Sequence, residues 1–168
     1  MTVTVVHRPS SPSVAASVIA LGFVAVVLAM ADFTAALVTL IAVPLFAMAG
    51  IWGVRRMMAL GVMILLIGLI LAAIGGAAVS TMLAAGVLAV TAWDLLDHGF
   101  SLGEHVGRSA RTIRSELVHG AATVLVGTGT AAILLVGIEL IPSGWPVGAV
   151  VFALLAGMFA LLALEHQD

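Results

Sequence analysis

The chain has no cysteine and no lysine, and it has few charged residues of any kind. The absence of cysteine excludes disulfides, zinc–thiolate sites, thiol catalysis and cysteine-ligated iron–sulfur clusters within this chain. Charged residues make up 8% of the 168 positions and hydrophobic residues 63%, whereas soluble proteins carry roughly 25% charged residues. A soluble domain of this size cannot bury so many apolar side chains. The composition therefore predicts a protein that is covered by lipid.

The net charge is −2, which gives no general basic surface. Binding to nucleic acid depends on such a surface, so no nucleic-acid partner is expected. Any electrostatic function has to come from a local cluster of charges.

Six apolar runs follow one another, each without an internal charged residue. They cover approximately residues 14–30, 33–54, 57–75, 77–93, 120–138 and 147–164. Each approaches the ~20 residues that a helix needs to cross a bilayer. The sequence predicts an all-α integral membrane protein, a six-transmembrane-helix bundle. Its membrane domain is expected over residues 14–165, between short cytoplasmic tails at 1–13 and 166–168.

Turn signals separate the runs. Asp32 marks a tight first hairpin, Gly75-Gly76 a third turn, and residues 141–146, which hold two prolines and a glycine, a fifth turn. Pro44 lies midway through the second run and removes one helical hydrogen bond, so a kink is expected there.

The arginines set the predicted orientation. Cytoplasmic loops carry an excess of Lys and Arg, and six spans put all six arginines on one side. Trp52 and Trp93 fall at predicted inner ends and Trp145 at an outer turn, where amphipathic rings favour the interface. The protein is therefore expected in the cell membrane as a multi-pass protein with both termini in the cytoplasm.

Small residues recur at four-residue spacing along several spans, and such stripes let helix backbones approach in a membrane. The stripes are Gly68, Ala72 and Gly76; Ala149, Ala153 and Gly157; and Gly127 and Ala131. They predict packing within the bundle, with a homo-oligomer face as the alternative.

Most of the polar chemistry lies between the fourth and fifth runs. The residues are Asp94, Asp97, His98, Glu104, His105, Arg108, Arg111, Arg114, Glu116 and His119. Ser101 and Glu104 have the spacing of a capping box, which predicts a helix start at Ser101. Apolar positions at helical spacing then predict an amphipathic helix over residues 101–118 on the cytoplasmic surface.

The favoured function is that of a non-enzymatic membrane subunit or scaffold. Its cytoplasmic loop would dock a partner protein or anionic lipid through Arg108, Arg111, Arg114 and Glu104, because arginines near the inner leaflet attract anionic headgroups. Glu104 and Arg108 are also spaced as a helical ion pair. This function needs no cofactor.

Two alternatives stay open. Asp94 and His98 share a helix face, and Glu116 and His119 match half of the Glu-x-x-His pattern of di-iron bundles, so a membrane metal or haem enzyme is the second hypothesis. A small-solute channel or carrier is the third, although the spans contain no ionisable group for ion transport.

The loop resembles a haloarchaeal family of small polytopic membrane proteins of unknown function. The resemblance rests on Trp93-Asp94, Leu102-Gly103, Gly107-Arg108, Ala110, Thr112, Arg114, Glu116 and His119. Members of that family resemble accessory components encoded beside ATPase and protease-like genes, and an asparagine often stands near the place of His98. The resemblance implies that the loop is the functional part of the protein and that His98 is not required as a ligand.

Overall fold

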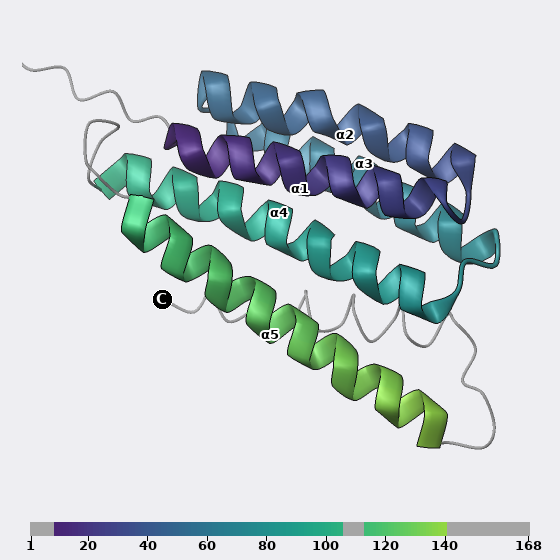
Figure 1. The fold of residues 1–168 in the computed structure, drawn as a ribbon. Coiled ribbons are helices and arrows are strands. Elements are labelled where there is room, and N and C mark those ends of the chain that lie inside the picture. The colour runs from purple at the N-terminus through teal and green to yellow at the C-terminus, as the bar shows by residue number, and fades with distance from the viewer. Residues whose placement is uncertain (1–8, 106–112, 141–168) are drawn as a thin grey trace, which may run out of the picture.

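The computed structural model describes residues 9–105 and 113–140, and every regular element in these ranges is an α-helix (Figure 1). The helices are α1 (Ser11–Ala29), α2 (Phe33–Trp52), α3 (Arg55–Ile74), α4 (Val79–His105) and α5 (Ile113–Leu140). All five are long and apolar enough to cross a membrane. Five of the predicted spans are thus confirmed as helices, and the sixth, 147–164, lies outside the described residues.

The turns predicted at Asp32 and at Gly75-Gly76 are confirmed. Asp32 caps α2, because its Oδ1 accepts from the backbone N–H of Ala35 at 2.9 Å. α2 ends at Gly53, whose φ of 71° is a left-handed conformation that glycine adopts without strain. Gly76 has a φ of 80° in the turn between α3 and α4. Consecutive helices therefore run antiparallel.

The neighbour relations give the bundle its order. α1 packs between α2 and α4, α3 packs on α2, and α5 packs mainly on α4, so that α5 lies at the edge of the described bundle (Figure 1). The core contains few large side chains among many alanines. Its largest fully buried apolar members are Leu21, Val24, Leu28, Phe46, Met82, Leu83 and Leu96.

The small-residue stripe of α3 is confirmed at two of its three positions. Gly68 and Ala72 are buried, and a Cβ on Gly68 would collide with Thr39 Oγ1 of α2. Gly76 is exposed in the turn and takes no part in packing. Close contact of α2 and α3 thus depends on Gly68. Pro44 lies inside α2, which is helical on both sides of it.

α4 is longer than the span predicted at 77–93. It continues through the polar stretch to His105, because Asp94 and Asp97 make polar contacts with α5 and α3 rather than ending the helix. The predicted helix start at Ser101 is wrong. Ser101 lies inside α4, and its Oγ donates to the carbonyl of Asp97 at 3.2 Å, the back-bond that serines make within helices.

The remainder of the predicted amphipathic helix 101–118 divides between two places. Residues 106–112 lie outside the described residues, and residues 113–118 form the beginning of α5.

Candidate functional site

Up-and-down connectivity brings five helix ends together: the start of α1, the end of α2, the start of α3, the end of α4 and the start of α5 (Figure 1). We call this the polar end of the bundle. Its polar side chains are Ser10, Ser13, Arg55, Asp94, Asp97, His98, Glu104, Glu116, His119 and Thr123. The opposite end carries the Asp32 and Gly75-Gly76 turns, which approach each other so closely that a Cβ on Gly75 would lie 2.6 Å from Asp32 Oδ2.

Glu116 is the most buried carboxylate of the polar end, at 5% exposure. The hydroxyls of Ser10 and Ser13 donate to its Oε2 at 2.8 and 2.7 Å. Ser10 also caps α1, since its Oγ accepts from the backbone N–H of Ser13. A buried carboxylate is costly without such donors. The pairing therefore fixes the first turn of α5 against the first turn of α1.

A serine row on α1 continues this contact toward α4. Ser17 Oγ donates to the carbonyl of Ala92 at 2.6 Å. A Cβ on Gly99 would lie 2.8 Å from the Cβ of Ser13, so the two backbones are close at that level. Ser10, Ser13 and Ser17 recur every three or four residues on one face of α1, and small hydroxyl side chains suit close, hydrogen-bonded helix packing in membranes.

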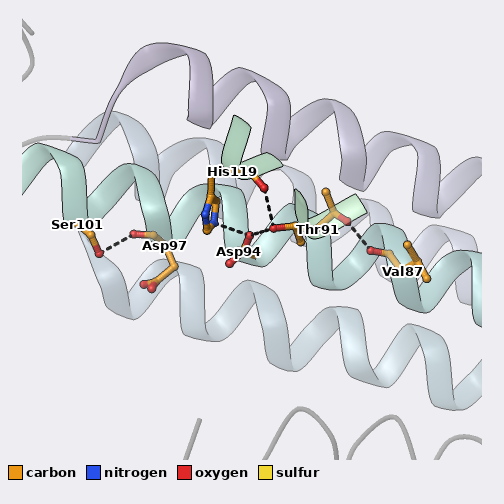
Figure 2. A network of polar contacts seen from close by, with 7 residues as sticks. Val87, Thr91, Asp94, Asp97, Ser101 and His119 are labelled. Atoms are coloured by element: carbon orange, nitrogen blue, oxygen red, sulfur yellow. Dashed lines mark hydrogen bonds and ion pairs between the residues drawn. The ribbon is translucent and has the colours of Figure 1, made fainter. Parts of the chain in front are cut away.

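Asp94 of α4 joins two residues of α5 (Figure 2). Thr123 Oγ1 donates to Asp94 Oδ2 at 2.6 Å. His119 Nε2 lies 2.8 Å from the same oxygen, an ion-pair distance without the alignment of a hydrogen bond. Thr123 also contacts the carbonyl of His119 at 3.1 Å. Asp94 therefore connects α4 to α5 through non-covalent polar contacts.

His98 stacks on His119. The ring centroids are 3.9 Å apart and the planes differ by 11°. His98 Nε2 is buried and has no hydrogen-bond partner among the described residues. The stack extends the α4–α5 contact by one turn toward the end of α4.

Arg55, at the start of α3, reaches α4. Its Nη1 lies 2.6 Å from Asp97 Oδ1 and its Nε lies 3.4 Å from Glu104 Oε1, with the guanidinium 5.0 Å from the centre of the Phe100 ring. The expected partner of Glu104 was Arg108, which lies outside the described residues. One arginine thus contacts two carboxylates of the polar end.

The four residues of the metal hypothesis all lie at the polar end, but their side chains do not converge on one position. Asp94 contacts His119, and His98 stacks on the same ring, whereas Glu116 is held by two serines. Within residues 9–105 and 113–140, no group of three or more His, Asp or Glu side chains is placed to hold an ion. Two stacked imidazoles direct their nitrogens along parallel planes, which does not converge on one metal.

The arginines of the docking hypothesis are only partly described. Arg114 lies exposed in the first turn of α5, and Arg108 and Arg111 lie outside the described ranges. Arg56, in the first turn of α3, is also exposed. Neither Arg56 nor Arg114 has a carboxylate partner in the part of the chain that the structure describes.

Sequence reasoning missed the serine row, Thr123 and the Arg55 contacts. The serine row could have been predicted from the sequence. Serines are the only polar residues in 9–30, and those at 10, 13 and 17 share one helix face. The contacts of Arg55 could not, since its partners lie 42 or more positions away along the chain.

A model of a family of unknown function, DUF7519, matches residues 7–162. Comparisons with curated proteins and with solved structures found no match.

Proposed function

Since this chain belongs to that family of unknown function, whose description assigns no activity, we propose a function from the polar end itself. The protein is a non-enzymatic integral membrane scaffold whose arginine-bearing end docks an anionic partner at the cytoplasmic face. Anionic lipid headgroups are the partner that the contacts favour. An acidic partner protein is the other outcome of the test below.

The observation that carries the proposal is the division of charges at the polar end. The carboxylates are engaged inside the bundle: Glu116 by serines, Asp94 by Thr123, and Asp97 by Arg55. Arg56 and Arg114 are exposed and lack carboxylate partners among the described residues. Glu104, whose side chain is 54% exposed, is paired with Arg55. The exposed charged side chains that lack an ion-pair partner among the described residues are therefore the two arginines, and these are the charges available to a partner.

Lipid is favoured over protein by the position of these arginines. Arg56 follows Trp52 by four residues across the turn between α2 and α3, and Trp52 is 54% exposed. Exposed tryptophan beside arginine is typical of the headgroup layer, where each arginine attracts anionic lipid by about 1 kcal/mol. The same reasoning supports a cytoplasmic location for the polar end, because arginines concentrate on that side.

The finer topology belongs to this proposal. The segment 147–164 forms a sixth span, which brings the C-terminus to the same side as the N-terminus. The haloarchaeal origin that the resemblance implies also stays a prediction.

The test compares three purifications from the native membrane in mild detergent. Wild type is compared with a variant in which Arg108, Arg111 and Arg114 are changed to Ala, and with a matched variant in which they are changed to Lys. We expect co-purified anionic phospholipid to fall several-fold in the Ala variant and to persist in the Lys variant, because lysine keeps the charge.

Loss of a co-purifying protein with unchanged lipid would assign the arginines to a protein partner instead. If the Ala variant retained both lipid and proteins at wild-type levels, the docking function would be refuted.

A further inference from the structure

Within the part of the chain that the structure describes, α5 is packed on one side only. On that side His119, Gly120, Thr123 and Gly127 contact or closely approach α4. Glu116 on the same side bonds to the serines of α1, and Ala131 is half-buried. The approach is close at Gly127, where a Cβ would lie 3.0 Å from Val87 Cγ1 of α4. No other described helix covers α5 to a comparable extent.

The opposite side of α5 carries a regular row that we call the α5 seam. It consists of Val118, Ala122, Leu125, Gly129, Ala132 and Val136, which are spaced by four and three residues in turn and are all exposed. Leu125 is 74% exposed, and a Cβ on Gly129 would meet nothing within 4 Å. The spacing is that of a helix–helix seam, with seven residues for two turns.

Residue spacing alone does not distinguish a helix–helix seam from a face covered by lipid, because every straight face of a helix has this spacing. The size of the side chains distinguishes the two. The exposed row of α1 is made of Ala15, Ile19, Phe23, Val26 and Met30, with one small residue, and that of α3 of Leu60, Met63, Ile67, Ile70 and Ile74, with none. The α5 seam instead has alanine or glycine at three of its six positions. Small residues are enriched where helices meet in membranes, because they allow close backbone approach.

One segment of this chain has a matching row. Within residues 147–164, alanines stand at 149, 153, 156, 160 and 163, again spaced by four and three. Eighteen helical residues extend about 27 Å, close to the thickness of the hydrocarbon core. Only residues 141–146 separate this segment from the end of α5, and short connections place successive membrane helices side by side and antiparallel.

We propose that residues 147–164 pack antiparallel on the α5 seam through this alanine row. The inference rests on the proposed sixth span. It also predicts a register, because residues whose distances from the connection agree within one position should lie opposite each other. Ala132 lies eight residues before Leu140, and Ala156 lies nine after Val147. One heptad further from the connection, Leu125 meets Ala163 by the same count.

Cysteine cross-linking tests the register directly, since the natural chain has no cysteine. The two test pairs are Ala132→Cys with Ala156→Cys, and Leu125→Cys with Ala163→Cys. The control pair is Thr130→Cys with Ala156→Cys, because Thr130 lies at similar depth but off the seam. Disulfide formation is followed in native membranes under copper-catalysed air oxidation.

We expect both test pairs to cross-link within one chain at least tenfold faster than the control pair. Using two pairs keeps the test informative if one double variant fails to fold. Two results would overturn the proposal. Dimers cross-linked through Ala132→Cys alone would mean that a second copy covers the seam. Equal, slow cross-linking of test and control pairs would mean that lipid covers it.

A sidedness measurement separates this inference from the topology on which it rests. Gln167→Cys should react with a membrane-impermeant thiol reagent from the same side of the membrane as Arg56→Cys at the polar end. Reaction from the side opposite to Arg56→Cys would refute the sixth span itself. Reaction from the same side without cross-linking would refute only the packing on the α5 seam.

Discussion

Ser13 and Glu116 are 103 positions apart in the chain, and the hydroxyl of Ser13 donates to the Glu116 carboxylate at 2.7 Å. This bond, with the parallel one from Ser10, joins the first turn of α1 to the first turn of α5. It sets where α5 begins and therefore where the exposed Arg114 lies.

The first prediction concerns this bond. Ser13→Ala should lower the free energy of unfolding by about 1–3 kcal/mol, because a buried carboxylate loses a donor. Glu116→Leu should cost more than Glu116→Gln, since glutamine keeps an oxygen that accepts from the serines. Unfolding by a denaturing detergent, followed by circular dichroism, provides the measurement.

Ser80→Ala is the control for Ser13→Ala. Ser80 is exposed near the start of α4, at the other end of the bundle, so its change should stay within about 0.5 kcal/mol. Equal effects of the two serine changes would contradict a structural role for the Ser13–Glu116 bond.

The second prediction concerns the contact of α2 with α3. Gly68→Ala places a Cβ against Thr39 Oγ1 and 3.1 Å from the Ala35 carbonyl oxygen, so it should destabilise the bundle by about 1–3 kcal/mol. Thr39→Ala in the same chain should recover part of this loss. It removes one of the two obstacles, a buried hydroxyl with no partner among the described residues. A double-mutant cycle of thermal stability measures this coupling.

Gly22→Ala is the matched control, because nothing lies within 4 Å of the Cβ that it adds to α1. Alanine is the better helix former, so this change should be neutral or stabilise by up to about 1 kcal/mol. Destabilisation by Gly22→Ala as large as that by Gly68→Ala would refute the steric account.

The third prediction uses two neighbouring arginines that differ in their contacts. Arg55→Ala should lower stability by about 0.2–1 kcal/mol, the usual range for a partly exposed ion pair, because Asp97 and Glu104 lose their cation. Arg56→Ala should leave stability unchanged, but it should reduce the anionic lipid that co-purifies. The opposite assignment of the two effects would show that the charges are divided otherwise than we describe.

The fourth prediction separates the scaffold from the metal or haem enzyme. Dialysis against a chelator should leave the melting temperature unchanged, because Glu116 is held by serines and the two histidines stack. Metal analysis and an absorption spectrum of protein from native membranes complete the measurement. Stoichiometric metal, with a melting temperature that falls on chelation and recovers when the metal is restored, would support the enzyme instead.

Helices and turns that depend on local sequence features were predicted correctly within the described residues. A run such as 33–54 is recognisable as a helix because apolarity is a property of each residue, and Asp32 and Gly76 mark turns through their own conformational preferences. The same reasoning failed at Ser101, where the local capping pattern was overridden by tertiary contacts. α4 continues through this stretch because Asp97 is paired with Arg55.

The sequence identifies the polar stretch that contributes to the polar end, but it does not predict which residues contact one another there. The polar stretch from Asp94 to His119 was recognised, because charges are conspicuous between apolar runs. Its actual partners, Ser13, Arg55 and Thr123, lie on other helices, and no local rule connects residues so far apart in the chain. Up-and-down topology brings them together, which makes the serine row of α1 a part of the site.

The central claim is that the polar end faces the cytoplasm, and single cysteines in this cysteine-free chain test it most directly. Arg56→Cys marks the polar end and Ala31→Cys the opposite turn, and both positions are exposed. A membrane-impermeant thiol reagent applied to intact cells should label Ala31→Cys and should reach Arg56→Cys only after the membrane is opened. Labelling of Arg56→Cys in intact cells, with Ala31→Cys protected, would contradict the account.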